Sequence, residues 1–303
     1  MSTDSDIPLH QAHRLHGRHW RDNAYCYPVV SRRSGGLSIG INLNPDTACN
    51  FDCIYCQVDR TTPPAVRSVG PHSGPYKVDL DQLRSELDLL LGVACDGSLF
   101  TTSPFDAIGA DQRCVCDIAF SGDGEPTTYP RFDEAVQIAA EARAARGLDQ
   151  TKLILITDAC YLMQPRVVAG LEIMDQNNGE IWAKLDAGTE DYYQRVNRPS
   201  HPLSHVLANI RQTALVRPIV IQSMWMKVHG RPPPDEELHA FAGHLNDITA
   251  AGGRIKLVQV YTIARRTAEA YATALPKREL DRAAAIIRGT ANLPLQTYYG
   301  TEG

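Results

Sequence analysis

The chain has 303 residues, of which 43% are hydrophobic and 21% charged, and its formal net charge at pH 7 is −5. This length suits one α/β barrel or two small domains with a substantial core. The negative balance excludes a globally basic protein drawn to a phosphate backbone, although a local basic face stays open. No run approaches the roughly twenty apolar residues that cross a bilayer, and residues 1–21 lack the apolar core of a signal peptide, so a cytoplasmic protein without membrane contact is expected.

Residues 1–36 are expected to form a polar N-terminal extension. Histidine recurs there at every third position, in His10, His13, His16 and His19. These side chains could share one helical face and bind a metal ion, but a frayed arm is the favoured interpretation.

A first strand is predicted over residues 37–43, and a cysteine-rich loop follows it. The loop carries Cys49, Cys53 and Cys56 in the spacing Cys-x-x-x-Cys-x-x-Cys. Three close thiolates suit an iron–sulfur cube, which takes four ligands, so one iron is left open to a ligand that is not protein. In a reducing compartment the eight cysteines are not expected to pair, which makes metal binding the better use of clustered thiols. The alternative is three unrelated thiols.

Residues 57–113 are expected to be an insertion. It begins with a Pro- and Gly-rich surface loop over residues 61–76, and an amphipathic helix is predicted over residues 78–91.

From residue 116 onward, apolar strands and helices alternate. Strands are predicted at 116–120, 152–157, 180–186, 218–224 and 254–261, and helices at 132–146, 164–174, 203–214, 235–251 and 276–288. Buried strands separated by helices require a parallel sheet covered by helices. With the first strand there are six βα units, which predicts a partial (β/α)6 TIM-like barrel over residues 37–265 and a C-terminal helix and tail over 266–303.

In such folds ligands gather at the carboxyl ends of the strands. The polar residues at those ends are Gly122, Asp123, Gly124 and Glu125 after the second strand, Thr157 and Asp158, Lys184 and Asp186, Gln222 and Ser223, and Gln259 and Tyr261. Period-two alternation places Trp182, Lys184 and Asp186 on one face of their strand. Taken singly, each of the others is at least as well explained as a cap, a turn or a satisfied core group.

The cysteine spacing, with the aromatic Tyr55 just before the last cysteine, resembles the radical S-adenosylmethionine (SAM) superfamily. The run Ser121-Gly-Asp-Gly-Glu-Pro126 is similar to that superfamily's glycine-rich strand end, which receives the SAM amino group. The resemblance implies a [4Fe-4S] cluster on the three cysteines, SAM on its open iron and a 5'-deoxyadenosyl radical. It also implies an electron donor such as flavodoxin or ferredoxin. The SAM contacts expected on this basis are Tyr55, Gly122, Asp123, Gly124, Glu125, Thr157, Lys184, Asp186, Gln222, Gln259 and Tyr261. For Lys184 and Asp186 the alternative is an exposed ion pair.

The sequence from about residue 37 to about residue 265 is similar to the radical SAM group that includes the wyosine-forming tRNA enzymes. The motifs that carry this similarity are Ser38–Pro45, Phe120–Pro126, Leu185–Ala187 and Val196-Asn-Arg-Pro199. Those enzymes hold pyruvate on a lysine and a second cluster on cysteines, both upstream of the radical motif. This chain has no lysine before Lys77, and only Cys26 precedes Cys49. Neither device can be built there in the same way.

The remaining cysteines and several polar residues have no assigned role. Cys26, Cys95, Cys114, Cys116 and Cys160 suggest an auxiliary cluster or, for the last four, a hydrogen donor, but buried free thiols are commoner. Arg195, Asn197 and Arg198 follow the fourth strand, and a guanidinium there could clamp a carboxylate or phosphate of the substrate, against the alternative of solvated loop charges. Tyr298-Tyr-Gly300 could close the barrel or lie in solvent.

The sequence therefore predicts a radical SAM enzyme that removes a hydrogen atom from an unidentified organic substrate. The first alternative is an RNA-modifying enzyme of the wyosine type, for which affinity should fall steeply with salt. The second is a non-catalytic iron–sulfur sensor or binding protein, which would not release 5'-deoxyadenosine.

Overall fold

The computed structural model describes residues 20–47, 49–58 and 78–300. The chain divides into two compact units. The first comprises residues 1–48, 64–155 and 169–179, and the second comprises residues 49–63, 156–168 and 180–303. The four N-terminal histidines and the loop predicted at 61–76 lie outside the described residues.

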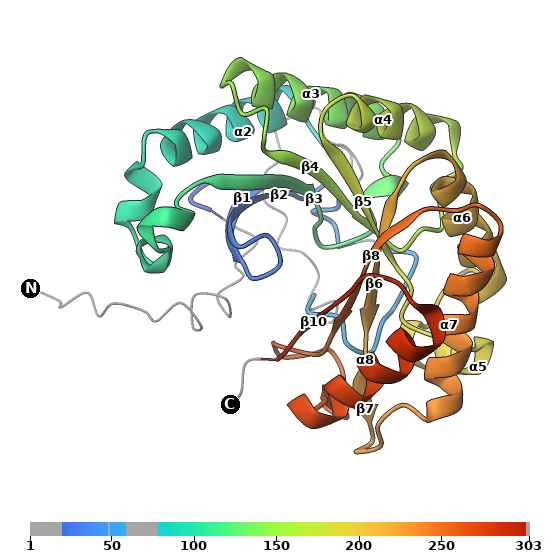
Figure 1. The fold of residues 1–303 in the computed structure, drawn as a ribbon. Helices are drawn as coiled ribbons and strands as arrows, with labels where there is room; N and C mark the ends of the chain where they lie inside the picture. The colour runs from blue at the N-terminus through green and yellow to red at the C-terminus, as the bar shows by residue number, and fades with distance from the viewer. Residues whose placement is uncertain (1–19, 48, 59–77, 301–303) are drawn as a thin grey trace, which may run out of the picture. The chain divides into compact units, whose positions relative to one another are not determined.

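The first unit contains a sheet with the strand order β1-β2-β3-β4 (Figure 1). Its strands are β1 (Cys26–Ser31), β2 (Gly36–Ile41), β3 (Val115–Phe120) and β4 (Lys152–Thr157). Its helices are α2 (Leu80–Cys95), α3 (Phe132–Ala145) and the short η1 (Ser98–Thr101), η2 (Phe105–Ala107), η3 (Ala110–Gln112) and η4 (Pro126–Thr128), and α4 (Pro165–Asp175) spans both units. The β2–β3 and β3–β4 pairings are parallel, whereas β1 runs antiparallel to β2.

Two local features explain the position of β1. Pro28 lacks an N–H for a sheet ladder, which restricts it to edge strands, and β1 is an edge strand of this sheet. Gly40 on β2 lies opposite Tyr27 on β1 in the strand register. The tyrosine ring packs over Gly40, since a Cβ there would lie 2.2 Å from the ring. The glycine therefore makes room for a buried aromatic side chain on the sheet.

Helix α2 is joined to β1 by a buried carboxylate. Glu86 is 7% exposed and accepts hydrogen bonds from the backbone N–H groups of Ala24 and Tyr25, both at 2.8 Å. The helix begins where the side chain of Asp79 accepts from the N–H of Gln82 at 3.1 Å. A charged residue on the buried face is thus satisfied by backbone donors.

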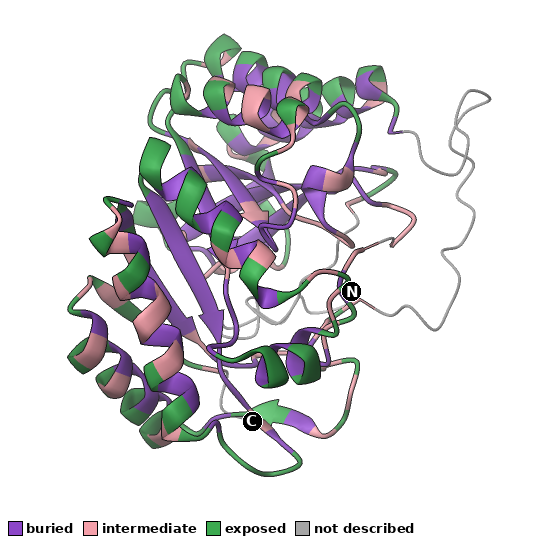
Figure 2. Cartoon of the chain, turned by 90° about the vertical axis from the view of Figure 1, so that its right-hand side faces the viewer, coloured by how far each residue is buried: buried purple, intermediate pink, exposed green. Residues whose placement is uncertain are grey.

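The second unit contains a parallel run of strands in the order β5-β6-β8-β10 and a small antiparallel pair, β7 with β9. Its strands are β5 (Gly179–Lys184), β6 (Ile219–Met224), β7 (Met226–Val228), β8 (Ile255–Tyr261), β9 (Ala272–Ala274) and β10 (Leu295–Tyr298). Its helices are α5 (Glu190–Asn197), α6 (Leu203–Val216), α7 (Asp235–Ala250) and α8 (Lys277–Ala291). In Figure 2 the strands are largely buried, while the helices alternate buried and exposed faces.

The predicted fold class is confirmed: the protein is mixed α/β with mostly parallel strands and covering helices, the class of a partial TIM-like barrel. Every strand and helix predicted from residue 37 onward is present, with ends displaced by four residues or fewer. The sequence did not predict β1, α5, the β7–β9 pair or β10. Strand β10 pairs in parallel with β8, so the C-terminal tail also contributes a strand.

Candidate functional site

The three cysteines of the spaced motif lie on one short loop of the second unit, residues 49–58, and all are partly exposed. Between them, Ile54 and Tyr55 are buried. The N–H of Cys56 donates to the carbonyl oxygen of Cys53 at 2.9 Å and closes a tight turn at the end of the motif. The turn directs the apolar and aromatic side chains inward and leaves the three cysteine residues partly exposed.

The backbone of this cysteine loop is hydrogen-bonded on two sides to other segments of the second unit. The segment that ends helix α5 lies on one side, and residues 268–269 lie on the other. The bonds are Asp52 N to Asn197 O (3.2 Å), Ile54 N to Val196 O (3.0 Å), Ser200 N to Asn50 O (3.1 Å), Ala268 N to Cys56 O (2.8 Å) and Glu269 N to Ile54 O (3.1 Å). The loop is therefore fixed by its backbone before any cofactor is considered.

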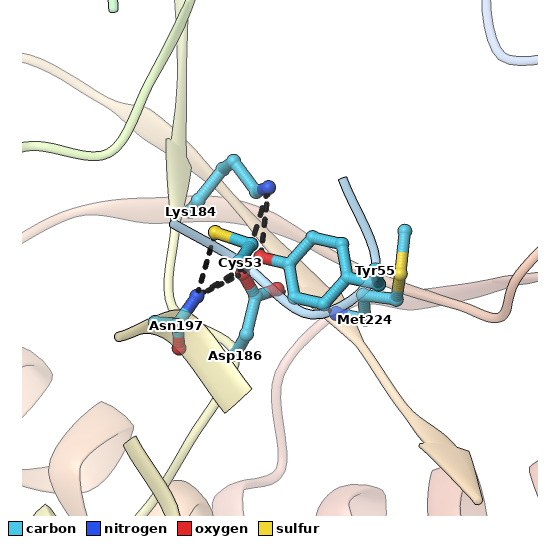
Figure 3. Close-up of polar contacts among 6 residues, drawn as sticks. All are labelled: Cys53, Tyr55, Lys184, Asp186, Asn197 and Met224. Carbon is cyan, nitrogen blue, oxygen red and sulfur yellow. Dashed lines mark hydrogen bonds and ion pairs between the residues drawn. The ribbon is translucent and has the colours of Figure 1, made fainter. Parts of the chain in front are cut away.

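The hydroxyl of Tyr55 is the centre of a polar cluster beside Cys53 (Figure 3). It donates to the carboxylate of Asp186 and accepts from Lys184 Nζ at 2.9 Å. The ammonium of Lys184 also lies 4.6 Å from the centre of the Tyr55 ring and 3.6 Å from Asp186. Two of the predicted strand-end residues are thus brought together with the aromatic residue of the cysteine motif.

Asp186 is buried, with 2% of its surface exposed, and its carboxylate is fully engaged. Besides the Tyr55 hydroxyl, it accepts from the N–H of Met224 at 2.7 Å and from Asn197 Nδ2 at 3.3 Å. The alternative of an exposed ion pair between Lys184 and Asp186 is wrong, because burial and three donors fix the carboxylate in the interior.

Asn197 is the residue whose part in this cluster the sequence did not predict. Its Nδ2 lies 3.0 Å from the Tyr55 hydroxyl and 3.5 Å from Cys53 Sγ. Asn197 ends helix α5, which is short and polar. The signal for that helix was present: Thr189 accepts from the N–H of Tyr192 as an N-cap, and two acidic residues follow it.

Burial and charge act in opposite directions on the cluster. Burial raises the pKa of the Cys53 thiol, while the positive charge of Lys184 and the hydrogen bond from Asn197 partly counteract it. Burial lowers the pKa of Lys184, but attraction to Asp186 outweighs it and holds that pKa well above its ordinary value. Lys184 is therefore a fixed positive charge beside the cysteine loop.

The donor set fits an iron–sulfur cube. Among the described residues no three His, Cys, Asp or Glu side chains converge on one metal ion. In a cube each thiolate binds a different iron, so such convergence is not required. Asn50, inside the motif, has both side-chain polar atoms buried without a partner in the described part of the chain. Buried amide groups are costly unless something satisfies them, which is consistent with a ligand beside the loop.

The glycine-rich motif, residues 122–125, belongs to the first unit and follows β3. A Cβ on Gly122 would lie 2.2 Å from Asn42 Oδ1 and 2.9 Å from Asn42 Cα, so only glycine fits there. Asn42 Nδ2 donates to Asp123 Oδ2 at 2.6 Å, and Asn42 Oδ1 accepts from the N–H of Asp123 at 3.1 Å. Gly124 lies in the bend that follows.

Glu125 ends this motif and is buried at 3% exposed. Its Oε1 accepts from the N–H of Thr127 at 3.1 Å and from Thr127 Oγ1 at 2.5 Å, so it caps the short helix η4. The carboxylate expected to meet a SAM amino group thus has a structural use of its own.

The strand ends of β6 and β8 carry an amide pair. Gln222 Nε2 donates to Gln259 Oε1 at 2.8 Å, and both side chains are almost fully buried. In register, Gln222 faces Lys184 on β5 and Gln259 on β8, and Tyr261 lies two residues further along the same face of β8. Gln222 Oε1 and Ser223 Oγ have no hydrogen-bond partner among the residues described.

Thr157 and Asp158 form a turn after β4. Thr157 Oγ1 accepts from the N–H of Ala159 at 3.0 Å, and Asp158 Oδ1 accepts from the N–H of Cys160 at 2.9 Å. Ala159 has a positive φ of 68°, which the two side-chain bonds stabilise. In the structure, therefore, both side chains stabilise a turn, which was the alternative to a ligand role.

The arginines that follow β5 are engaged within the chain. Arg198 pairs with Asp52 at 3.1 Å and with Glu269 at 2.7 Å, so it ties the cysteine loop to the segment on its other side. The guanidinium of Arg195 lies 5.8 Å from the centre of the Tyr192 ring.

The other cysteines are spread over both units. Cys114 and Cys116 have their sulfur atoms 3.7 Å apart. Cys95 is exposed, whereas Cys26 and Cys160 are buried. No third ligand joins the Cys114–Cys116 pair within the described ranges.

In the described part of the chain, no helix combines the length and the apolar character that crossing a membrane requires. No protein-family model matches the sequence. A curated protein described as GTPase Obg of Brachyspira hyodysenteriae is 23% identical over 258 residues, which is 84% of this chain and 32% of that protein. A UPF0026 protein of Helicobacter pylori is 24% identical over 185 residues, 60% of this chain and 49% of that protein. The chain thus spans half or less of the length of these relatives.

Two solved structures share the fold. TYW1 with a bound lysine–pyruvate adduct has a TM-score of 0.51 at 14% identity and covers 94% of this chain and 83% of its own. A mutant of spore photoproduct lyase has a TM-score of 0.53 at 10% identity and covers 92% of this chain and 80% of its own. The predicted resemblance is therefore confirmed at the level of the fold, which this chain shares with both proteins.

Proposed function

We propose that this chain is a radical SAM enzyme with one [4Fe-4S] cluster on Cys49, Cys53 and Cys56. The observation that carries the proposal is a loop of three partly exposed cysteines, spaced as in that superfamily and fixed by its backbone on two sides. The fold shared with TYW1 and spore photoproduct lyase supports it. When bound, the cluster and SAM supply a 5'-deoxyadenosyl radical that removes a hydrogen atom from an organic substrate.

The residues around the loop divide into two roles. Asp186 and Tyr55 have their polar atoms engaged with each other and with Lys184, so we assign them to positioning of the cysteine loop. The ammonium of Lys184 offers a third donor beyond these two partners, which suits a SAM carboxylate. The resemblance leaves the amino group of SAM to the glycine-rich motif, and we propose Gln222, Gln259, Tyr261 and Thr157 as further contacts for SAM or substrate.

The burial of the amide pair supports its place among the binding residues. An acceptor such as Gln222 Oε1, buried without a partner in the described chain, costs roughly 1–3 kcal/mol unless a bound N–H or O–H group satisfies it. A ligand with a donor group at the carboxyl ends of β6 and β8 would remove that cost. An external one-electron donor of the flavodoxin or ferredoxin type completes the proposal, and the reducing environment that it needs favours the cytoplasm.

The test is reductive cleavage of SAM. Protein reconstituted anaerobically with iron and sulfide is treated with dithionite and SAM, and 5'-deoxyadenosine is measured by mass spectrometry. We expect its release from the wild-type chain and from Cys95→Ser, which changes an exposed thiol outside the loop. Release that is absent from fully reconstituted wild-type protein would favour the sensor alternative and overturn the enzymatic one.

A wyosine-type reaction on RNA is the second candidate, and the likeness to TYW1 is its support. The lysine–pyruvate adduct named for that structure needs a neutral amine to attack a carbonyl carbon. Lys184 is the lysine beside the cysteine loop, and its raised pKa keeps it protonated. An RNA reaction in this chain would therefore need a different carbon donor, and RNA affinity that falls steeply with salt would be its first sign.

The GTPase name of one relative finds no support in this sequence. A phosphate-binding loop of that type ends in Gly-Lys followed by Ser or Thr. None of the lysines in the chain is followed by Ser or Thr.

A further inference from the structure

The segment 196–199 runs beside the cysteine loop and fixes its backbone, but its side chains have no part in the function proposed above. Ile54 donates its N–H to the carbonyl oxygen of Val196 at 3.0 Å, and Phe51 forms an antiparallel bridge with Pro199. Arg198 adopts a left-handed conformation with φ of 43°, which turns the chain out of helix α5. The cysteine loop therefore packs against residues 196–199, which we call the platform.

Within this platform, the side chain of Asn197 points at a cysteine of the motif (Figure 3). It is 2% exposed, and its Nδ2 lies 3.5 Å from Cys53 Sγ. The same nitrogen lies 3.0 Å from the Tyr55 hydroxyl and 3.3 Å from Asp186 Oδ2. A group that faces a carboxylate must be the amide NH2, so two N–H donors serve these acceptors. Since Tyr55 itself donates to Asp186, one N–H of the amide is available to the sulfur.

The other end of the amide shows that Asn197 is not placed there for stability alone. Its Oδ1 is buried and has no hydrogen-bond partner in the described part of the chain. An unsatisfied buried acceptor destabilises a fold, and an apolar side chain of similar volume would avoid that cost. The position therefore retains an N–H donor for the acceptors around it, of which Cys53 Sγ is the one that belongs to the cysteine motif, at the expense of an unsatisfied acceptor.

On the basis of the proposed function, we propose that Asn197 is a positioning residue that donates a hydrogen bond to the Cys53 sulfur and thereby raises the reduction potential of the cluster. Hydrogen bonds to the sulfurs are among the factors that set cluster potentials. A donor favours the reduced state, because the added electron increases the negative charge on the sulfur ligands. The positive charge of Lys184, which donates to the Tyr55 hydroxyl, also favours the reduced cluster. The hydrogen bond from Asn197 is the contribution that a single substitution removes while that charge stays in place.

The test is an EPR-monitored redox titration of the reconstituted cluster without SAM. We expect Asn197→Ala to shift the one-electron midpoint to a more negative value, by about 59 mV, which corresponds to a tenfold loss in the reduction equilibrium. Because a cavity at a buried position could disturb the loop, Asn197→Leu is the second variant; it fills a similar volume and offers no donor. The matched control is Gln194→Ala on the same helix, where the exposed side chain donates a hydrogen bond to Glu190 and does not reach the cysteine loop in the described part of the chain.

The outcomes separate this inference from the proposed function. A wild-type chain that binds no [4Fe-4S] cluster removes the function and the inference together. A wild-type chain with a cluster whose midpoint is unchanged in both Asn197 variants leaves the function in place and overturns the inference. A negative shift in both variants, with Gln194→Ala at the wild-type value, supports it.

Discussion

The cysteine loop of the second unit and the glycine-rich turn of the first are built on different principles. In the turn, the critical feature is a missing side chain: Gly122 lies against Asn42, and the polar groups satisfy each other locally. In the loop, the critical feature is a set of side chains from distant positions, among them Asp186 and Asn197. The glycine motif therefore depends on the absence of a side chain, and the cysteine motif depends on hydrogen bonds to distant residues. The two are expected to respond differently to substitution.

The largest effect is expected at the cysteines. Cys53→Ser should abolish cluster binding and lower 5'-deoxyadenosine release by more than ~100-fold, since even mutating the partners of a metal ligand costs roughly 10–100-fold. Iron and sulfide analysis checks this. The double variant Cys114→Ser/Cys116→Ser, which removes the thiol pair of the first unit, should keep full iron content; iron loss there and not at Cys53 would place the cluster elsewhere.

The network behind the loop should rank next. Asp186→Ala leaves the Met224 N–H, the Asn197 amide and the Tyr55 hydroxyl without their acceptor and the Lys184 charge without its counterion. We expect the free energy of unfolding to fall by about 3–5 kcal/mol, measured by urea denaturation of the apo-protein. Asp52→Ala removes an exposed ion pair of the same loop and should cost about 1 kcal/mol or less. Equal losses in the two variants would refute the network.

The glycine turn should respond to an added methyl group. Gly122→Ala would push a Cβ into Asn42, and the expected loss is about 1–3 kcal/mol. Gly243 lies in helix α7 with open space around its Cβ position, so Gly243→Ala should instead stabilise the chain by up to about 1 kcal/mol. Thermal unfolding of both variants checks the contrast, which fails if Gly122→Ala behaves like Gly243→Ala.

A smaller, pH-dependent effect is expected on the strand that carries the turn. Burial raises the pKa of Asp117 in β3, and hydrogen bonds from Ser34 and Ser38 only partly counteract it. A raised pKa means that the folded state binds the proton more tightly than the unfolded state does. Protonation of Asp117 therefore stabilises the fold fully below the pKa of the unfolded state, and this contribution is lost as the pH rises through the pKa of the folded state.

Asp117→Asn should therefore be more stable than wild type at pH 7, by no more than roughly the 1–3 kcal/mol that a poorly satisfied buried polar group costs. The gap should close as the pH falls towards the ordinary pKa of an aspartate. Urea midpoints at pH 4 and pH 7 measure it, and a gap that widens at low pH would contradict the sign.

Much of the fold could be predicted because strand and helix periodicity is local. The apolar runs of β4 and β6 and the amphipathic spacing of α6 and α7 were sufficient. Strand β1 was missed because Pro28 weakens a strand pattern, and β10 because four residues carry too little periodicity. Both depend on pairing with a neighbour rather than on their own sequence.

The site could be predicted as far as chemistry follows from spacing. The cysteine motif and the pairing of Lys184 with Asp186 on one strand face were predictable from sequence alone. The partnership of Tyr55 with Asp186 joins residues 131 positions apart, and the contact of Asn197 with Cys53 joins residues 144 apart. No local pattern encodes such contacts, since they depend on how the loop packs against the end of α5.

The central claim is that three thiolates hold a cube of iron and sulfide with one iron open to SAM. The most direct measurement is the EPR spectrum of the reduced, anaerobically reconstituted chain before and after SAM is added. The account predicts the signal of a reduced [4Fe-4S] cluster whose g-values change when SAM binds. Zinc in place of iron, or a cluster spectrum that SAM leaves unaltered, would contradict it.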